Sequence, residues 1–216
     1  MTESQGYGVF PMVGFAGPIG CGKNTAARLL GELYGNVRQI AFADPVREGV
    51  LAMSPLIIWD NIPQRLADVV KTHGWDVVKR KSYEARRLLQ TYGTEAGRHV
   101  HGENCWVMRA QSIVIAGIMI GSLAEPESEP FFAFTDVRFP NEGDWLNSHG
   151  QGYFWIDRPG LPDVPENQHA SESFAIALKM RSRGIILNDG SESDFKQRIE
   201  EKVGPIIRKL SIYKSA

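Results

Sequence analysis

The sequence predicts an α/β protein with a parallel sheet, and three observations support this prediction. Short apolar runs alternate with segments of helical periodicity, which is typical of parallel strands joined by crossover helices. A glycine-rich turn stands between the first apolar run and the first helical segment. With 216 residues, of which 43% are apolar, the chain should bury about 70% of its unfolded surface. We therefore expect one domain with insertions.

Five short apolar runs have the composition of strands. They cover residues 12–16, 37–43, 131–135, 153–156 and 185–187. A helix is expected over 24–34, where apolar residues share one face and Gly35 marks the end. A closing amphipathic helix is expected over 194–210, interrupted at Gly204-Pro205.

About ninety residues separate the second predicted strand from the third, far more than one crossover needs. Helices are expected there over 45–53, 63–73, 82–92 and 105–120. This stretch is the natural place for a substrate-binding insertion. A second unusual stretch, Pro159–His169, carries three prolines without periodicity and is expected to be a loop or lid.

The composition excludes several classes of protein. Lys and Arg number 24 against 25 Asp and Glu, so the chain lacks the basic excess of a nucleic-acid-binding protein. Two cysteines, Cys21 and Cys105, are too few for a disulfide framework. The most apolar run, 113–123, has about half of the residues that a membrane helix needs. A signal peptide begins with a basic segment, but no Lys or Arg precedes Lys23. We therefore expect a cytosolic protein with no nucleic-acid and no membrane partner.

The segment Gly17–Lys23 fits G-x-x-x-x-G-K, the phosphate-binding loop, and a strand precedes it while a helix follows. Gly17, Gly20 and Gly22 let backbone N–H groups curl around an anion, and the helix N-terminus adds a favourable dipole. Lys23 would span the β- and γ-phosphates of a nucleotide. The plainer alternative is a glycine-rich turn with an incidental lysine. A dinucleotide-binding loop is excluded, because G-x-G-x-x-G does not occur.

The loop departs from the common pattern at one position. Asn24 follows Lys23 where Ser or Thr normally supplies a hydroxyl to Mg²⁺, and the hydroxyl arrives one residue later at Thr25. Asn24 can offer its amide oxygen to the metal, directly or through water, while Thr25 donates to the α-phosphate. Metal coordination is therefore less firmly predicted than phosphate binding.

A phosphate-binding loop identifies a cofactor and leaves the reaction open. A GTPase switch, a nucleic-acid motor and a small-molecule kinase all use such a loop. The guanine motif N-K-x-D is absent, which weakens the GTPase, and the small size and neutral charge weaken the motor.

Other segments join the loop in one resemblance. They are Phe42–Pro45, Arg87–Gln90 running on to Gly93–Glu95 and Arg98, Asn104, Trp106, Asp136–Glu142, His169–Glu172 and Ile186–Gly190. Together with a loop of the form GKxT, this set resembles the deoxynucleoside monophosphate kinases of tailed bacteriophages, from Val13 to about Phe195. DVRFPNE and the block from Arg-Leu-Leu-Gln to Gly-Thr-Glu are its specific parts. The family loop usually reads GKDT, so Asn24 stands in place of an acidic residue.

The resemblance implies a P-loop NTPase fold like that of adenylate kinase, with a five-stranded parallel sheet flanked by helices. It implies a single domain whose parts are a core (8–44, 107–157 and 176–216), a helical monophosphate-binding insertion (45–106) and a lid (158–175). It also implies phosphoryl transfer from Mg-ATP to a dNMP, giving ADP and dNDP, in the cytoplasm of the host bacterium if the chain is phage-encoded. A homodimer is left open. Such transfer depends on charge neutralisation and positioning, for which a lysine, a metal ion and arginines suffice.

The acceptor is expected to bind in the insertion. The residues that the resemblance implies for this role are Asp44, Arg47, Arg87, Gln90, Thr94, Glu95, Arg98 and Trp106. Asp44 is expected at the carboxyl end of its strand, where ligands collect in α/β sheets. It can equally cap the helix that starts at Pro45. Arg47, one turn later, either reaches the acceptor phosphate or is a surface arginine.

The remaining acceptor candidates also have plainer alternatives. Arg87 and Arg98 carry guanidinium forks that match phosphate oxygens, but Arg87 and Arg86 belong to a basic cluster of the kind that is usually just solvated. Of these two neighbours we favour Arg87. Gln90 lies on the same helical face and can read the base. Trp106 either stacks on the base or belongs to the core.

On the nucleotide side, Asp136 ends a hydrophobic strand beside the phosphate-binding loop, the position of an acid that holds the hydration shell of Mg²⁺. The plainer alternative for Asp136 is a loop cap. Arg138 would then face the transferring phosphoryl group. Arg158, at the start of the lid, would close on the ATP phosphates and help exclude water. The arginines that compete for this role are Arg181 and Arg183. The residues implied to border the adenine are Asn188 and Gly190.

Two other functions stay open at this point. One is a different small-molecule P-loop kinase, such as one acting on dephospho-coenzyme A. The other is a regulator that binds ATP without an acceptor. Dependence of ATP turnover on an added dNMP distinguishes both from a dNMP kinase. The accepted bases and the choice between deoxyribose and ribose are not encoded in any motif found here.

Overall fold

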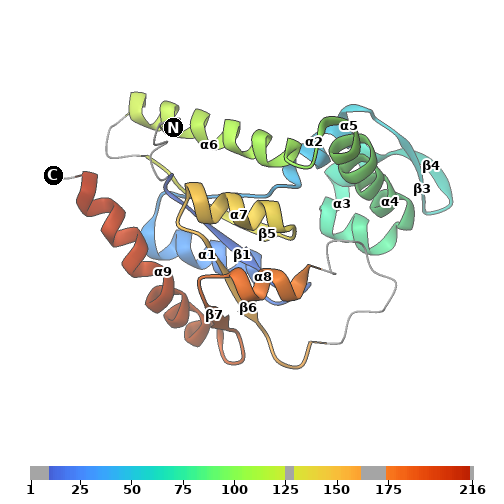
Figure 1. Ribbon diagram of the computed structural model, residues 1–216. Coiled ribbons are helices and arrows are strands. Elements are labelled where there is room, and N and C mark those ends of the chain that lie inside the picture. Colours follow the sequence, from blue (N-terminus) through green and yellow to red (C-terminus); the bar gives the residue numbers. More distant parts are fainter. Residues whose placement is uncertain (1–9, 125–128, 162–173, 215–216) are drawn as a thin grey trace. The chain divides into compact units, whose positions relative to one another are not determined.

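The computed structural model describes residues 10–124, 129–161 and 174–214 (Figure 1). The chain forms two compact units, one made of Met1–Ala41 with Ala110–Ala216 and the other of Phe42–Arg109. We call the first the sheet unit and the second the inserted unit. The predicted insertion, 45–106, lies inside the inserted unit, and most of the predicted lid lies outside the described residues.

The sheet unit contains a parallel sheet of five strands in the order β2-β5-β1-β6-β7. The strands are β1 (Met12–Ala16), β2 (Val37–Ile40), β5 (Phe131–Val137), β6 (Tyr153–Asp157) and β7 (Ile185–Leu187). The predicted fold class, a five-stranded parallel sheet flanked by helices, is therefore confirmed. The carboxyl ends of the strands form the end of the sheet where ligands of α/β proteins collect, and β1 lies at the middle of it.

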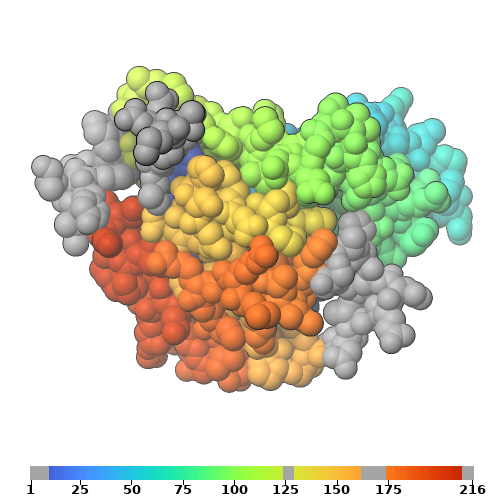
Figure 2. Space-filling view, in the orientation of Figure 1, coloured from blue at the N-terminus to red at the C-terminus, as the bar shows by residue number. Residues whose placement is uncertain are grey.

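Successive side chains of a strand point to opposite faces, and nearly all residues of β1, β5 and β6 are buried, so both faces of the sheet are covered at these three inner strands. On one face Val13, Phe15 and Ile156 form a cluster with α1 (Lys23–Tyr34) and α9 (Glu192–Lys214). On the other face, α7 (Pro140–His149) and α8 (Ala175–Arg181) cover the sheet. The Phe134 and Trp145 rings meet edge to face at 5.5 Å there, and the Tyr153 hydroxyl donates to the Leu178 carbonyl at 2.8 Å. Figure 2 shows α7 and α8, in yellow and orange, as the outer surface over this face.

The closing helix differs from its prediction. Pro205 was expected to interrupt it, yet α9 continues through this residue to Lys214. A proline within a helix removes one backbone donor and costs about 3 kcal/mol. The neighbours Val203 and Ile207 are buried in the core cluster of the sheet unit, so packing on either side of the proline keeps the helix in register.

The inserted unit is mainly helical. Its elements are α2 (Asp44–Ala52), β3 (Leu56–Trp59), β4 (Ile62–Arg65), α3 (Leu66–Lys81), α4 (Tyr83–Thr91), the π-helix η1 (Tyr92–Arg98), α5 (His99–His101) and the first turn of α6 (Cys105–Ala124). Its core is a cluster in which Val50, Ile57, Trp59, Leu66 and Val78 are buried. The cluster joins the hairpin to α2, α3 and α4.

A hairpin replaces the start of one predicted helix. The expectation of a helix over 63–73 is wrong at its beginning, because 62–65 forms β4 and pairs antiparallel with β3. Asp60 and Asn61 connect the strands with φ of 49° and 64°, the left-handed conformation that a two-residue hairpin turn requires. Asn and Asp tolerate this conformation better than other residues with a Cβ. The dipeptide was therefore the signal in the sequence that pointed to a hairpin.

The helix α6 also corrects an expectation. We expected an apolar run about half as long as a membrane helix, but Cys105–Leu123 forms 19 helical residues with a mean hydropathy of 1.5, of which 28% are buried. By length and composition alone, one helix of the described part of the chain is thus able to cross a membrane. Core helices of soluble proteins meet the same criterion, so it is weak evidence. Within the sheet unit, the middle of α6 packs on β5, where Gly117 meets the Phe132 ring.

Candidate phosphate-binding site

The predicted phosphate-binding loop connects β1 to α1 at the carboxyl end of the central strand. Gly17, Gly20 and Gly22 have φ of 139°, 82° and 110°, values that side chains with a Cβ rarely adopt. The three glycines of the motif therefore stand at the positions where the backbone adopts a positive φ. Gly22 is the N-cap of α1 and provides no side-chain cap, so the first N–H groups of this helix are available to an anion.

Lys23 lies against the loop that precedes it. Its Nζ donates to the carbonyls of Gly17 and Pro18, at 2.7 Å each, and lies 3.7 Å from the Cys21 sulfur. Burial lowers the pKa of Lys23, and the charge of Arg138 lowers it further, while Cys21 and Asp136 act in the opposite direction. A partly desolvated cation whose two short hydrogen bonds go to neutral carbonyls is well placed to bind anionic ligands in place of these carbonyls.

Two further side chains bind carbonyls of the loop. The Arg158 guanidinium donates to the Gly20 carbonyl at 3.3 Å, and the Asn188 amide donates to the Cys21 carbonyl at 2.8 Å. With the two bonds of Lys23, four loop carbonyls are thus satisfied by the chain itself. These acceptors are held toward the protein, which is the arrangement that an anion site built from N–H groups requires.

Asp136 and Arg138 come from the neighbouring strand and the turn after it. Asp136 is 6% exposed and is the penultimate residue of β5, whose last residue, Val137, pairs with Ala16 at the start of the loop. The turn is fixed by Glu142, which is 2% exposed and accepts hydrogen bonds from the N–H groups of Arg138 (2.8 Å) and Phe139 (3.1 Å). The Glu142 carboxylate therefore fixes the backbone conformation at Arg138.

The donors near the loop fit a metal ion that arrives with phosphates. In the described ranges, no group of three or more His, Cys, Asp or Glu side chains is arranged to hold a metal. Asp136 offers a buried carboxylate, while Asn24 is exposed in the first turn of α1. Mg²⁺ in phosphoryl-transfer sites keeps several waters and binds through one or two protein groups plus substrate phosphates. The residue set suits that mode of binding.

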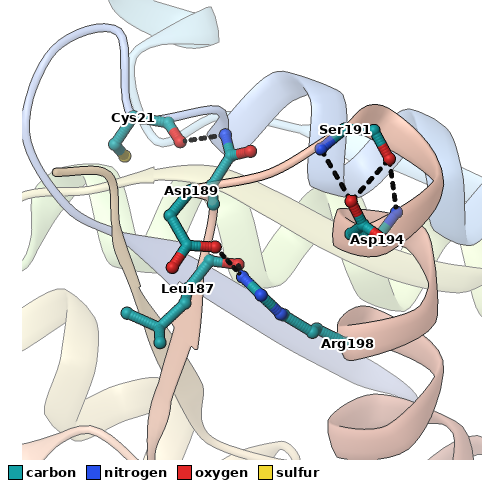
Figure 3. A network of polar contacts seen from close by, with 7 residues as sticks. Cys21, Leu187, Asp189, Ser191, Asp194 and Arg198 are labelled. Carbon is teal, nitrogen blue, oxygen red and sulfur yellow. Dashed lines mark hydrogen bonds and ion pairs between the residues drawn. The ribbon is translucent and has the colours of Figure 1, made fainter.

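The residues expected to border the adenine lie in the loop between β7 and α9, which is held by a network of polar contacts (Figure 3). Arg198 of α9 pairs with Asp189 and donates to the Leu187 carbonyl at 2.9 Å. The Ser191 N–H and hydroxyl both donate to Asp194, at 2.8 and 2.6 Å. Gly190 packs on this turn, since a Cβ there would lie 2.7 Å from an Asp194 oxygen.

In the inserted unit, Asp44 occupies a different position from the one expected. The strand β2 ends at Ile40, and Asp44 is the first residue of α2, so it does not lie at the carboxyl end of a strand. The alternative, in which Asp44 caps a helix that begins at Pro45, is also not met, because α2 begins at Asp44 and its N-cap is Ala43. Asp44 forms an ion pair with Arg47 at 2.7 Å within the first turn. These two acceptor candidates are therefore partners of one another.

The other acceptor candidates lie on α4 and on the π-helix that continues it. Arg87 and Gln90 are exposed on α4, whereas the neighbouring Arg86 lies over the Tyr83 ring, 6.0 Å from its centre. Thr94 and Glu95 belong to η1, and Arg98, at its end, donates to the Glu103 carbonyl at 2.9 Å. π-helical turns are rare and are frequent at functional sites. Nothing in the sequence analysis anticipated this one.

Trp106 is the residue that shapes this π-helix. Its indole N–H donates to the Gly93 carbonyl at 2.7 Å, and its ring packs directly on Gly97, where a Cβ would not fit. The Tyr92 ring lies 6.1 Å from it. The indole is thus engaged by the backbone of η1, while Trp106 as a whole is half-buried.

The predicted site residues are divided between the two units. Those in the sheet unit are Gly17, Gly20, Gly22, Lys23, Asn24, Thr25, Asp136, Arg138, Arg158, Asn188 and Gly190, and those in the inserted unit are Asp44, Arg47, Arg87, Gln90, Thr94, Glu95, Arg98 and Trp106. The competing arginines have other partners, since Arg181 pairs with Asp144 at 3.2 Å and Arg183 donates to the Gln151 carbonyl at 2.8 Å. His169–Glu172 lies outside the described residues.

Comparison with known proteins identifies relatives of modest similarity. No family model matches the chain. It is 24% identical over 197 residues to a protein of Acanthamoeba polyphaga mimivirus provisionally named a deoxynucleotide monophosphate kinase, covering 87% of this chain and 94% of that protein. It is 26% identical over 187 residues to the deoxynucleoside-5'-monophosphate kinase of Escherichia phage T5, covering 62% of this chain and 71% of that one. The predicted resemblance to viral and phage kinases of this kind is therefore confirmed.

Among solved structures, the chain is similar to a dephospho-CoA kinase from Campylobacter jejuni. The TM-score is 0.38 at 14% identity, and the match covers 92% of this chain and 98% of the other.

Proposed function

We propose that the chain is an ATP-dependent deoxynucleoside monophosphate kinase, which transfers the γ-phosphoryl group of Mg-ATP to a dNMP and gives dNDP and ADP. The observation that carries the proposal is the formed phosphate-binding loop with Lys23 beside Asp136, in a chain whose curated relatives bear the names of such kinases. The proposed setting is the cytoplasm, that of a host bacterium if the chain is phage-encoded.

In the proposed mechanism, Lys23 exchanges its carbonyl partners for phosphate oxygens. The hydrogen bonds to Gly17 and Pro18 hold the ammonium group at the loop before the nucleotide arrives. An ion pair between an ammonium group and a phosphate is stronger than a bond to a neutral carbonyl, so ATP would displace these contacts. Thr25, in the first turn of α1, would donate its hydroxyl to the α-phosphate.

Asp136, with Asn24, would hold the hydrated Mg²⁺ that accompanies the ATP phosphates. The ion supplies charge neutralisation for the β- and γ-phosphates, which is the main electrostatic requirement of this reaction. The burial of Asp136 suits this role, because a carboxylate in a low-dielectric setting interacts more strongly with a cation than one in water. Glu142 contributes indirectly by fixing the turn that carries Arg138.

Arg138 and Arg158 would stabilise charge that develops on the transferring phosphoryl group. Both belong to the sheet unit, and the assignment is supported by the charge of Arg138, which lowers the pKa of Lys23, and by the hydrogen bond from Arg158 to the Gly20 carbonyl. Guanidinium groups suit this task, since their donors match phosphate oxygens in pairs and they stay charged at any physiological pH.

The acceptor would bind through the exposed polar residues of the inserted unit. Arg87 offers a guanidinium fork to the dNMP phosphate, and Gln90, on the same face of α4, offers an amide to the base. Thr94 and Glu95 would extend this surface along η1. Asp44 and Arg47, already paired, would act on the acceptor as a unit, with Arg98 as a further phosphate contact.

The proposal is tested by ADP release from Mg-ATP with each common dNMP and NMP added singly. We expect ADP formation to depend on one or more dNMPs and to be lost in Lys23→Ala, whose fold a melting curve would check. Stimulation by dephospho-coenzyme A instead would favour the other kinase class. Tight ATP binding without stimulation by any acceptor would overturn the kinase proposal in favour of a binding role.

A further inference from the structure

We propose that Asn188 is a positioning residue of the phosphate-binding loop. Its side-chain amide fixes the orientation of the peptide between Cys21 and Gly22 and so keeps the Gly22 N–H directed toward the phosphates. This inference rests on the proposed function, because it assumes that the loop binds ATP. It gives Asn188 a different role from the contact with adenine that the resemblance implies.

The contact is short and anchored at both ends. The Asn188 Nδ2 donates to the Cys21 carbonyl at 2.8 Å, in a partly buried setting and across 167 residues of sequence. The backbone N–H of Asn188 donates to the Asp157 carbonyl at the end of β6, also at 2.8 Å. Asn188 therefore ties the loop after β1 to the end of the adjacent strand in the sheet.

A peptide group is planar, and its carbonyl and N–H point in opposite directions. By holding the Cys21 carbonyl, Asn188 therefore also fixes the direction of the Gly22 N–H. Glycine makes rotation of the preceding peptide easy, because it adopts positive and negative φ with similar ease. Without the amide, nothing in the conformational preference of Gly22 would keep this N–H, at the start of α1, turned toward an anion.

The approach of Asn188 also explains part of the requirement for glycine at position 22. A Cβ on Gly22 would lie 2.6 Å from Asn188 Nδ2 and 3.4 Å from the Phe195 ring. Gly22 has φ of +110°, so both its conformation and its surroundings demand the absence of a side chain. The loop and the segment that follows β7 are therefore fitted to one another.

The turn that carries Asn188 is held on both sides (Figure 3). Arg198 binds the residue before it, through the Leu187 carbonyl at 2.9 Å, and the residue after it, through the Asp189 carboxylate. This ion pair also neutralises the Asp189 carboxylate near a site that should bind phosphates. Arg198 supports the position of Asn188 from α9 without touching the loop.

The test compares Asn188→Ala, Asn188→Asp, Arg198→Ala and the control Asn147→Ala. Asn147 also donates its amide to a backbone carbonyl, that of Arg181 at 3.3 Å, but from an exposed position on α7. ATP affinity is measured by calorimetry without an acceptor, together with melting curves and the KM values for ATP and for dNMP. These readings separate loss of the loop geometry from loss of the fold.

We expect Asn188→Ala to weaken ATP affinity about tenfold, the effect of one lost partly buried hydrogen bond. The KM for dNMP should be unchanged. Asn188→Asp should be worse than Asn188→Ala, because a carboxylate cannot donate to the carbonyl and repels phosphates. Arg198→Ala, which keeps the donor but loosens its turn, should weaken ATP affinity about threefold. Asn147→Ala should match the wild type.

The outcomes distinguish this inference from the proposed function. A wild-type chain that does not bind ATP overturns both. Wild-type binding that is retained in Asn188→Ala overturns the inference alone. A milder effect of the isosteric Asp variant than of the Ala variant would show that the shape of Asn188, rather than its donor, matters, and would also overturn it. If Asn188→Ala does not fold, an Arg198→Ala variant with unchanged ATP affinity would contradict the proposal.

Discussion

The two groups of candidate site residues are built in different ways. In the sheet unit, the phosphate-binding loop consists mainly of backbone, and Lys23, Arg158 and Asn188 hold its carbonyls in place. In the inserted unit, the acceptor candidates are long side chains, and Arg87 and Gln90 are exposed on α4. A site made of backbone is complete before its ligand binds, whereas a site made of long side chains must lose rotamer freedom when it binds.

The hydrophobic cores of the two units differ in the same direction. The core cluster of the sheet unit draws on strands and on α1 and α9, with Leu30 and Phe15 fully buried. The cluster of the inserted unit is smaller and centres on Leu66, Val50 and Val78. Regions with less buried apolar surface open at lower free energies. We therefore expect the sheet unit, which would bind the nucleotide, to have a higher free energy of local unfolding than the inserted unit, which would bind the acceptor.

The largest expected effect concerns the centre of the phosphate-binding loop. Lys23→Met keeps the length of the side chain but removes its charge, so we expect a loss of kcat of about 10²–10³-fold. Stability should change little, because relief of the buried charge, whose pKa burial lowers, offsets the loss of the two hydrogen bonds to the Gly17 and Pro18 carbonyls. Steady-state kinetics and chemical denaturation measure the two effects. A variant that stays active within tenfold would contradict the role of this lysine.

A pair of core variants tests whether the two units fail separately. Leu30→Ala and Leu66→Ala each remove a buried leucine and should each cost about 2–5 kcal/mol of unfolding free energy. Leu66→Ala should raise the KM for dNMP while ATP affinity is retained, and Leu30→Ala should impair both. Denaturation curves and calorimetry with ATP check this. Equal loss of ATP affinity in the two variants would remove the distinction between the units.

A smaller effect is expected for the arginines of α4. Arg87→Lys keeps the charge but loses the planar fork, so the KM for dNMP should rise about tenfold while the KM for ATP stays the same. Arg86→Lys serves as the matched control, because Arg86 lies over the Tyr83 ring, and its effect should stay within about twofold. The reverse ranking would assign the acceptor contact to Arg86.

The smallest effect is a pH dependence that belongs to the sheet unit. Burial raises the pKa of Tyr34 to about 12, with help from its hydrogen bond to Glu200, and burial raises the pKa of Tyr153 to about 12 as well. An unfolded tyrosine ionises near pH 10, so between pH 10 and about 12 the unfolded state binds fewer protons and stability falls as pH rises.

Melting temperatures across this range should therefore fall less steeply in Tyr34→Phe than in the wild type. Tyr83→Phe is the control, since Tyr83 lies exposed in the inserted unit, 70% accessible to solvent. A control variant that flattens the decline as much as Tyr34→Phe does would contradict the assignment to the sheet unit.

The contrast between the units also explains what the sequence could predict. Strands and loop of the sheet unit follow from apolar runs and from glycine spacing, because backbone geometry restricts which residues fit there. The π-helix depends on Trp106 packing against Gly97, a contact between residues nine positions apart that no periodicity records. Asn188 reaches Cys21 across most of the chain, so its contact with the loop could only be found in three dimensions.

Two other differences have local causes. The hairpin of β3 and β4 was not predicted, although Asp60 and Asn61 suit its turn, because each of its strands has only four residues. The helix α9 continues through Pro205. The buried residues on both sides of the proline pack into the core, and this packing outweighs the local penalty of the proline.

The central position of β1 has a consequence for how the protein is made. The strand β1 pairs with β5 and β6, whose residues follow more than a hundred positions later, and the loop after β1 contacts Asn188, which is synthesised later still. At typical synthesis rates, this leaves the apolar segment Met12–Ala16 without its strand partners for roughly 6–30 s. During that interval the nascent chain exposes an unpaired apolar strand, which makes it a natural client for chaperones, and the loop gains its contact with Asn188 only after this residue has been synthesised.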